Sequence, residues 1–328
     1  MIVITGGAGF IGSNLVASLE KRGGRELVVC DVLGTGDKWR NIAKRELTDI
    51  IPPDRLFDYL QTHKDKVEAV FHMGAISATT ERDADKIIEN NFALSKQLWQ
   101  FCAGQDIRMI YASSAATYGD GYQGFVDSDT PEALEKLRPL NPYGWSKHLF
   151  DRWVSRVTQS NGKTPRQWAG LKFFNVYGPN EYHKGDMMSV MCKLYPEIKG
   201  GKTARLFKSC NPKYGDGGQL RDFIYVRDCV DVMSWLYDTP AVCGLFNVGT
   251  GKARSFKDLA LATFKAANLN EKIEYIDMPE NLRDKYQYFT QADMSKLARA
   301  GYKKSFTSLE EGVKSYVQDY LAASDPYA

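Results

Sequence analysis

The chain has 328 residues, of which 43% are hydrophobic and 25% charged, so it can bury a core of ordinary size, which argues against intrinsic disorder. Its 43 basic and 40 acidic residues nearly balance, which argues against a nucleic acid or a membrane surface as partner. No apolar run approaches the ~20 residues that span a bilayer, and six scattered cysteines without a CxxC pair favour reduced thiols over zinc or disulfides.

The first half of the chain alternates short apolar runs with longer amphipathic stretches. Apolar residues at helical spacing predict helices over residues 10–22 and 87–103, and Pro52 marks a third helix start. Because a strand pattern begins at Ile2, no room is left for a secretory signal, and we expect a cytoplasmic protein. The rhythm predicts βαβ units and a parallel sheet covered on both faces. The strands are expected at residues 2–5, 27–30, 69–72 and 109–112.

The second half predicts a further lobe that interleaves with the first. A strand is expected at 171–174, after Gly170, and the Gly- and Pro-rich stretch 178–218 is expected to be irregular. A helix at 226–237 and a strand at 245–248 are expected to return to the first domain. We therefore predict two domains. Residues 1–172 and 222–250 would form a dinucleotide-binding domain, and residues 173–221 and 251–328 a smaller, mixed α/β substrate-binding domain.

A glycine-rich segment joins the first expected strand to the first expected helix. Residues 5–12 read TGGAGFIG, which fits GxGxxG from Gly7 and GxxGxxG from Gly6. Glycines allow a tight turn and a close backbone approach to a pyrophosphate, and the helix N-terminus then offers amide hydrogens to the anion. In this position the motif predicts a Rossmann-type dinucleotide site rather than a chance glycine-rich turn.

Charged residues after the second strand bear on the kind of dinucleotide. Asp31 ends that strand, nineteen residues after Gly12, where an acid can accept hydrogen bonds from the adenosine ribose, which favours NAD. Lys38 and Arg40 follow in the next loop, and a cation there could neutralise a 2′-phosphate. NADP and NAD both remain open from these residues, and the two cations could also be solvated loop charges.

A tyrosine and a lysine stand four residues apart in the sequence Tyr-Gly-Trp-Ser-Lys from Tyr143 to Lys147, hence on one helix face. A free phenol has a pKa near ~10. A nearby lysine and a nicotinamide cation would both lower the pKa of Tyr143 and make it a usable base. Lys147 can also bind the nicotinamide ribose. Ser114 follows the fourth strand at its carboxyl end, the edge where ligands bind in open α/β sheets.

The glycine loop, the serine at the end of a strand and the helix with the Tyr/Lys pair follow one another in this order. In this arrangement the chain resembles the extended short-chain dehydrogenase/reductase family over essentially its whole length. The resemblance implies an α/β fold, a Rossmann-type doubly wound parallel sheet with a smaller mixed α/β lobe, and Ser114 as a donor to the reacting oxygen beside Tyr143. It assigns cofactor contacts to Gly6, Gly9, Phe10, Ile11, Gly12, Asp31, Val32, Lys38, Met73, Gly74, Ala75, Ile76, Ser77, Asn90, Tyr143, Lys147, Val176 and Lys184.

The resemblance also narrows the reaction. Dehydratases of the family carry an Asp-Glu pair after the strand-end hydroxyl residue, where this chain has Ala115 and Ala116, so epimerisation or simple oxidoreduction is expected. Segments 111–119, 183–185 and 221–223 are most similar to the family's epimerases that invert C6 of an ADP-linked heptose for lipopolysaccharide. These imply bound NADP, a transient 6-ketone, and acid/base roles for Tyr143 and Lys184. Lys184 could otherwise be a phosphate contact or a solvated charge.

Substrate contacts are implied by position in the same way. Arg221 is the best supported, because a guanidinium can hold two phosphate oxygens; its alternative is an ion pair with Asp222. The chain departs from the family pattern at Val32, at Asp186 and Lys193, and in a longer loop at 210–220. The implied substrate contacts are Ser114, Asn175, Asp186, Lys193, Phe207, Lys208, Ser209, Arg221 and Tyr286.

Two alternatives remain beside an ADP-heptose epimerase. A UDP-hexose 4-epimerase or a nucleotide-sugar reductase of the same family would share Tyr143 but would not need Lys184. A non-catalytic NAD(P) sensor would keep the glycine loop, but retention of Ser114, Tyr143 and Lys147 speaks against it. The partners expected are an ADP-sugar and further copies of the chain, with no nucleic acid, membrane or metal. The homo-oligomer is implied by the resemblance alone.

Overall fold

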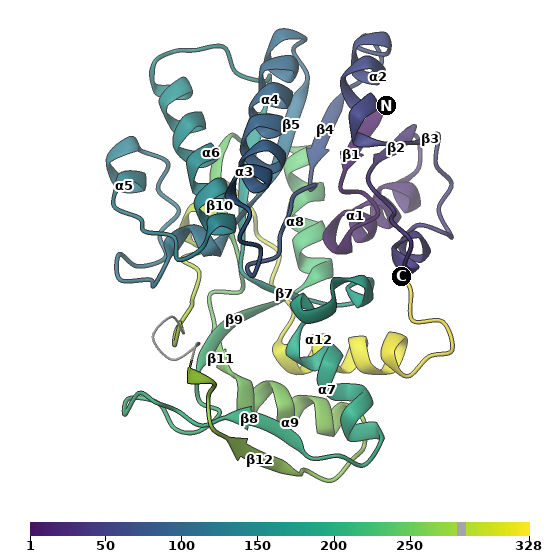
Figure 1. Cartoon of the computed structure of the whole chain (residues 1–328). Coiled ribbons are helices and arrows are strands. Elements are labelled where there is room, and N and C mark those ends of the chain that lie inside the picture. The colour runs from purple at the N-terminus through teal and green to yellow at the C-terminus, as the bar shows by residue number, and fades with distance from the viewer. Residues whose placement is uncertain (281–286) are drawn as a thin grey trace.

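The computed structural model describes residues 1–280 and 287–328, which form two lobes, one above the other in Figure 1. The upper lobe is built on a seven-stranded parallel sheet with the strand order β10-β6-β5-β4-β1-β2-β3. The strands are β1 (Ile2–Thr5), β2 (Leu27–Cys30), β3 (Asp49–Ile51), β4 (Ala69–His72), β5 (Arg108–Ser114), β6 (Trp168–Phe173) and β10 (Gly244–Val248). The order reverses between β1 and β4, and open sheets of this kind bind ligands beyond the carboxyl ends of the strands at that point.

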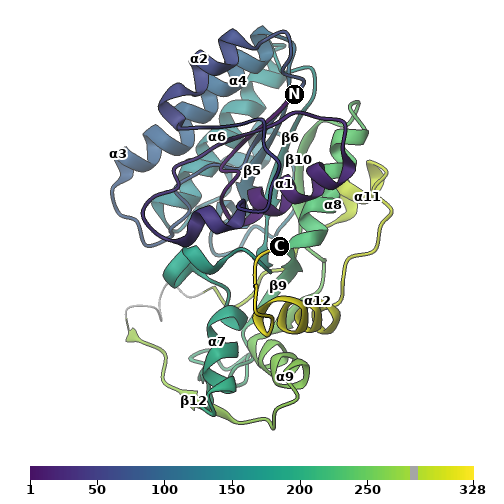
Figure 2. The ribbon, with the colours of Figure 1, turned by 90° about the vertical axis from the view of Figure 1, so that its right-hand side faces the viewer.

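Helices cover both faces of this sheet, as Figure 2 shows. Because successive strand residues face opposite sides, Ile2 and Ile4 join the core beneath α1, α8 and α11, while Val3 joins the core beneath α2, α4 and α6. Burial on both faces explains why these strands read as continuous apolar runs. The helices of this lobe are α1 (Phe10–Arg22), α2 (Leu56–Thr62), α3 (Ala84–Ile87), α4 (Leu94–Gly104), α5 (Pro131–Glu135), α6 (Pro142–Gln159), α8 (Val226–Asp238) and α11 (Ser295–Arg299).

The lower lobe contains two small sheets and the helices packed on them. A three-stranded sheet has the order β11-β9-β7, and a two-stranded sheet pairs β12 with β8. Its strands are β7 (Asn175–Tyr177), β8 (Ala204–Phe207), β9 (Leu220–Tyr225), β11 (Ala253–Ser255) and β12 (Ile273–Ile276), and its helices are α7 (Val190–Lys199), α9 (Phe256–Ala266) and α12 (Leu309–Ser315). The short helical turns of the chain are η1 (Asp37–Asn41), η2 (Pro53–Arg55), η3 (Ile88–Ala93), η4 (Ala115–Tyr118), η5 (Tyr182–Met187) and η6 (Tyr316–Leu321).

The α/β fold with a doubly wound parallel sheet and a smaller mixed lobe is confirmed, and so are most of the elements predicted for the first half. Strands β1, β2 and β4 and helix α1 have the predicted bounds. The strand predicted at 245–248 lies in β10, which pairs with β6 and so returns to the first sheet. The exact division into residues 1–172 with 222–250 and 173–221 with 251–328 stays a prediction. In the described ranges, no helix is both long and apolar enough to cross a membrane.

Three details of the prediction were wrong. The strand expected at 171–174 is β6, which begins at Trp168 and runs through Gly170. A Cβ at Gly170 would lie 2.5 Å from the Tyr111 ring on the paired strand, so this glycine makes room for an aromatic neighbour instead of breaking the strand. The stretch expected to be irregular contains α7 and β8. The three-residue edge strand β3 was not predicted.

A buried histidine at the end of β4 gives a prediction about acid stability. The ring of His72 bonds Thr5 Oγ1 at 2.6 Å and Ser95 Oγ at 2.9 Å, and burial lowers its pKa to about 3. Between pH 6.5 and about 3 the unfolded chain therefore binds a proton that the folded chain does not, and stability falls as the pH falls through this window. The His72 contribution is about 1.4 kcal/mol per pH unit.

The His72→Gln variant can keep a hydrogen bond but cannot take up this proton. We expect the free energy of unfolding of the wild type to fall more steeply between pH 6 and 4 than that of the variant, by about 1.4 kcal/mol per pH unit. Urea unfolding at several pH values measures the difference. Curves that run parallel for the two proteins would show that His72 is protonated in the folded state.

Candidate active site

The glycine loop lies at the point where the strand order reverses. Gly6 has a φ of +66°, and a Cβ there would lie 2.5 Å from Gly74 N, at the end of β4. A Cβ at Gly12 would lie 2.1 Å from Gly6 O. Helix α1 is capped by Gly9, which makes no side-chain cap hydrogen bond, so its first amides are available to an anion. The cradle fits the pyrophosphate of a dinucleotide, as predicted from the sequence.

Gly12 carries the first prediction about this cradle. Gly12→Ala places a methyl group against Gly6 O and must displace the loop, so we expect the dissociation constant for the nucleotide to rise about 100-fold, equivalent to about 3 kcal/mol. Gly104→Ala is a matched control, because a Cβ there meets no atom within 4 Å. Calorimetric titration with NADP and NAD measures both variants. Equal affinities would show that the loop has room for the methyl group.

Asp31 is already held by the protein. Its carboxylate accepts hydrogen bonds from Ala8 N at 2.9 Å and Val32 N at 2.7 Å, and Lys38 Nζ forms an ion pair with it at 2.5 Å. The negative charge that would repel a 2′-phosphate is therefore balanced by Lys38. Arg40 points elsewhere: it pairs with Asp37 and lies over the Trp39 and Tyr327 rings.

The three predicted catalytic residues of the upper lobe meet at the end of β5. Ser114 closes β5 and caps η4, accepting a hydrogen bond from Ala116 N at 3.1 Å. Tyr143 lies in the first turn of α6, with its phenol close enough to the Ser114 side chain for Ser114 to lower its pKa. Gly144 permits this approach, since a Cβ there would lie 2.7 Å from Ala116 O. The side chain of Lys147 is buried and donates to Ala112 O at 2.7 Å.

The charges around Tyr143 differ from the expectation in one respect. Burial raises the pKa of Tyr143 and the Ser114 hydrogen bond lowers it, whereas Asp151 raises it further. Lys147 was expected to lower this pKa, but its ammonium group is turned to the Ala112 carbonyl and its own pKa falls to about 8 on burial. In the chain by itself the lowering therefore comes from Ser114.

The segment after β4 is fixed by an asparagine that was not predicted from the sequence. Asn91 is fully buried and bonds both backbone groups of Ile76, at 2.8 and 2.9 Å, and Ser146 Oγ at 3.0 Å. It thus ties residues 73–77 to α6. Asn90, which was predicted to contact the cofactor, is exposed and donates to Lys86 O. The i, i+4 series Ile87, Asn91, Ser95 faces the core and could have identified the buried member of the pair.

Lys184 lies in η5, beside the start of α1. Its Nζ is 5.0 Å from the centre of the Phe10 ring, and burial lowers its pKa while Glu181 acts in the opposite direction. The neighbouring His183 bonds Asn41 at 3.2 Å, and Asn41 also donates to Ala8 O at 2.9 Å. The turn that carries Lys184 is therefore tied to the glycine loop.

The predicted substrate contacts of the lower lobe lie on several elements. Asn175 is exposed at the start of β7, and Val176 follows it. Lys193 Nζ donates to Asp186 O at 2.7 Å, so these two residues adjoin. The Arg221 guanidinium lies over the Phe256 ring, while the Asp222 carboxylate accepts hydrogen bonds from residues 250, 251 and 292.

The long loop after β8 shapes the other contacts predicted in this lobe. Phe207 ends β8 and is half-buried. Lys208 pairs with Asp277 at 3.0 Å, and Ser209 bonds Asp216 within the loop. Tyr286 lies outside the described residues.

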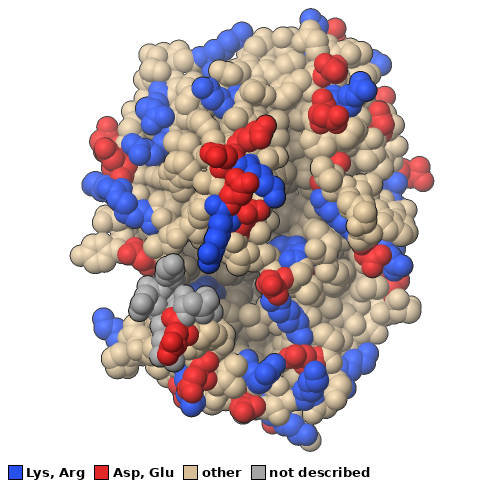
Figure 3. Space-filling model, viewed as in Figure 1, with Lys and Arg blue, Asp and Glu red and all other residues tan. Residues whose placement is uncertain are grey.

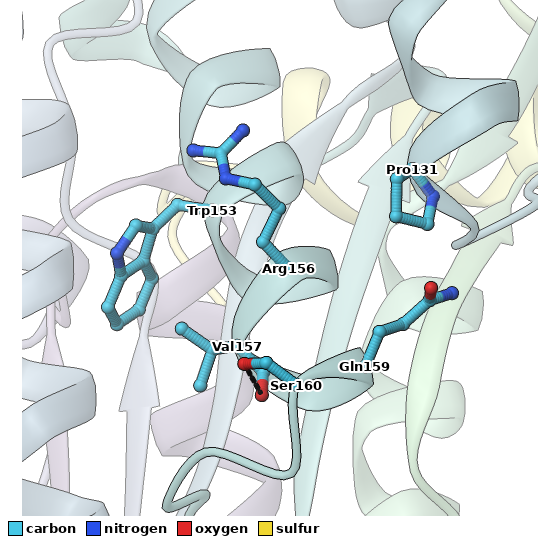
Figure 4. Close-up of a pocket in the computed structure, with 6 residues that line it drawn as sticks. All are labelled: Pro131, Trp153, Arg156, Val157, Gln159 and Ser160. Atoms are coloured by element: carbon cyan, nitrogen blue, oxygen red, sulfur yellow. Dashed lines mark hydrogen bonds between the residues drawn. The ribbon is translucent and has the colours of Figure 1, made fainter.

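The surface is hollowed between the lobes, and both basic and acidic side chains lie around the hollow (Figure 3). A separate cavity of about 510 Å³ lies beside the carboxyl-terminal half of α6, at the opposite end of this helix from Tyr143 (Figure 4). No predicted site residue that the structure describes borders it. Its lining residues are Pro131, Trp153, Arg156, Val157, Gln159 and Ser160. Among residues 1–280 and 287–328, no group of three His, Cys, Asp or Glu side chains could hold a metal ion.

A dinucleotide cradle beside a Ser, Tyr and Lys at one sheet edge is typical of a nicotinamide-dependent enzyme. Residues 2–249 match the NAD dependent epimerase/dehydratase family, to which the chain belongs. The chain is 54% identical to the ADP-L-glycero-D-manno-heptose-6-epimerase of Nitratidesulfovibrio vulgaris and 52% identical to the enzyme of the same name from Fusobacterium nucleatum. Both comparisons cover the full length of both chains.

Solved structures are similar at lower identity. The Helicobacter pylori ADP-L-glycero-D-manno-heptose-6-epimerase superposes with a TM-score of 0.77 at 26% identity, with 97% of this chain and 95% of that one covered. The Thermus thermophilus UDP-glucose 4-epimerase in complex with NAD gives 0.76, also at 26% identity, with 95% of this chain and 96% of that one covered. The resemblance to the extended short-chain dehydrogenase/reductase family is thereby confirmed.

Proposed function

We propose that this protein is an epimerase that inverts C6 of the heptose in ADP-D-glycero-D-manno-heptose and yields ADP-L-glycero-D-manno-heptose. The observation that carries the proposal is the placement of Ser114, Tyr143 and Lys147 at the carboxyl end of β5, at the same sheet edge as the glycine cradle. The full-length identity of 54% to the Nitratidesulfovibrio vulgaris enzyme of this name supports the choice of substrate. The reaction produces no net redox change.

The residues of the chain divide the proton chemistry between them. The bound NADP would supply the hydride chemistry at C6. Tyr143, as phenolate, takes the proton of the C6 hydroxyl while that carbon loses its hydride, which leaves a 6-ketone. Ser114 donates a hydrogen bond to the reacting oxygen. Once the ketone presents its opposite face, Lys184 donates the proton that completes the inverted alcohol, and in the reverse direction the two groups exchange roles.

We propose NADP as the cofactor. The ion pair of Lys38 with Asp31 supports this choice, because it balances the charge that a 2′-phosphate would otherwise face. The amides at the start of α1 would hold the pyrophosphate, and Lys147 the nicotinamide ribose. Mass spectrometry of the nucleotide that copurifies with the protein distinguishes NADP from NAD.

The proposal has a biological setting. Six free cysteines suit a reducing compartment, and we place the enzyme in the cytoplasm, where it would supply heptose for lipopolysaccharide cores. We also propose that it works as a homo-oligomer. Sedimentation velocity of the holoenzyme tests the last point.

The test of the function follows the C6 configuration. The purified holoenzyme is incubated with ADP-D-glycero-D-manno-heptose in D₂O, and the C6 epimers are separated and examined by NMR. We expect inversion with no deuterium at C6, because the hydride never exchanges with water. Inversion of UDP-glucose at C4 instead would favour the UDP-hexose epimerase alternative. If the protein binds a nucleotide but turns over neither compound, the alternative of a non-catalytic NAD(P) sensor would be favoured.

A further inference from the structure

A fully buried ion pair lies beneath the catalytic residues. Lys172 of β6 and Asp151 of α6 are both completely inaccessible, and their charged atoms are 2.8 Å apart. Asp151 also accepts a hydrogen bond from Ser113 Oγ at 2.7 Å and one from Tyr111 at 3.3 Å. No step of the proposed reaction uses this pair. Burying two charges is costly, and such pairs are weak evidence for stability.

The pair joins the elements that carry the catalytic groups. Tyr143, Lys147 and Asp151 follow one another at i, i+4 and i+8 on α6 and so share one helix face. On the other side, Lys172 donates to Thr117 Oγ1 at 2.7 Å, and Thr117 in turn donates to Ser114 O at 2.8 Å. The chain of contacts therefore runs from the helix of Tyr143 to the backbone of Ser114.

Given the proposed function, on which this inference rests, we propose that Lys172 is a positioning residue. By bridging Asp151 and Thr117, it fixes the turn that carries Ser114 against the helix that carries Tyr143. It also balances the charge of Asp151, which acts on Tyr143 and Lys147. To contact Asp151 and Thr117 at the same time, a side chain must be long and carry several hydrogen-bond donors, and lysine meets both requirements.

Other charged and titratable groups act on this cluster and must be counted in any pH dependence. Burial and Lys172 lower the pKa of His148 to about 4, and burial together with Asp151 raises the pKa of the Tyr111 phenol well above its usual value. Further groups that act on members of the cluster are Tyr118, Asp127, Asp129, Arg138 and Arg152.

The experiment compares Lys172→Met with Lys172→Arg and with the double variant Lys172→Met/Asp151→Asn, all as holoenzymes. Lys304→Met is the control, since it removes another lysine paired with an aspartate, Asp231, and neither residue acts on the Lys172 cluster. The measurements are kcat and KM for C6 inversion, the affinity for the nucleotide, and the titration of Tyr143 in ¹³C-tyrosine-labelled enzyme, assigned with Tyr143→Phe.

We expect Lys172→Met to lower kcat about 100-fold while KM and nucleotide affinity stay within about three-fold, the signature of misplaced reacting groups. The titration of Tyr143 should move to higher pH, because a displaced Ser114 side chain and an unbalanced Asp151 both raise the pKa of Tyr143. Lys172→Arg should restore most of kcat, and Lys304→Met should match the wild type.

The double variant carries the test if Lys172→Met does not fold, because it buries no unpaired charge. We expect its kcat to stay low, since the bridge to Thr117 is absent. A wild-type kcat in the double variant, or a Tyr143 titration unchanged in both variants, would overturn the proposal. The titration needs no substrate, so it decides on Lys172 even if the wild type fails to invert the ADP-heptose and the proposed function falls.

Discussion

Tyr143→Phe is expected to lower kcat for C6 inversion by about 10³-fold, within the range that general acid–base groups contribute. The phenylalanine keeps the ring and its packing, and only the hydroxyl that meets Ser114 is lost. Nucleotide affinity should be unchanged, because the glycine loop and Lys147 are untouched. Steady-state kinetics with ADP-heptose and calorimetric titration with NADP give the two quantities separately.

The control for this variant is Tyr122→Phe, which removes a phenol that is 88% exposed and should leave kcat at the wild-type value. In the wild type, activity should rise with pH on the acid side, because the reaction begins from the ionised phenol of Tyr143. Burial raises the pKa of this phenol, so the rise should extend to higher pH than for a free phenol. A Tyr143→Phe enzyme with more than about a tenth of the wild-type kcat would assign the proton transfer to another group.

The sequence predicted those parts of the fold whose pattern depends only on burial. β1, β2 and β4 are buried on both faces, so their apolar runs are unambiguous. β3 escaped prediction because Asp49 and Ile50 lie exposed at the sheet edge. α7 was hidden by Pro196, which lies inside this helix although proline usually ends one.

The candidate site was predictable to a similar degree. The spacing of Tyr143 and Lys147 indicated a shared helix face, and the order of the motifs placed Ser114 near them. Sequence spacing could not show that Lys147 turns to the Ala112 carbonyl, because that contact joins a helix to a distant strand. Lys172 did give a signal, since a lysine within an apolar strand must find a buried partner, but nothing local identified that partner as Asp151.

Lys184→Met is expected to lower C6 inversion by about 10³-fold while the nucleotide stays bound. Lys184 and Tyr143 come from different turns, η5 and the start of α6, as two separate acid/base groups would. Burial lowers the pKa of Lys184, which brings its ammonium group closer to the range in which it can give up a proton. Lys202→Met, at an exposed lysine, is the control and should keep the wild-type rate.

Lys184→Arg separates proton transfer from simple charge. An arginine keeps the positive charge and can hold a phosphate, but it does not release a proton in the range where enzymes work. If Lys184 serves as the second acid/base group, the arginine variant should be as slow as the methionine variant. If Lys184 only contacts a phosphate, the arginine variant should recover kcat and the methionine variant should show a raised KM instead. That second pattern would contradict the two-base scheme, because Tyr143 alone would then serve both faces of C6.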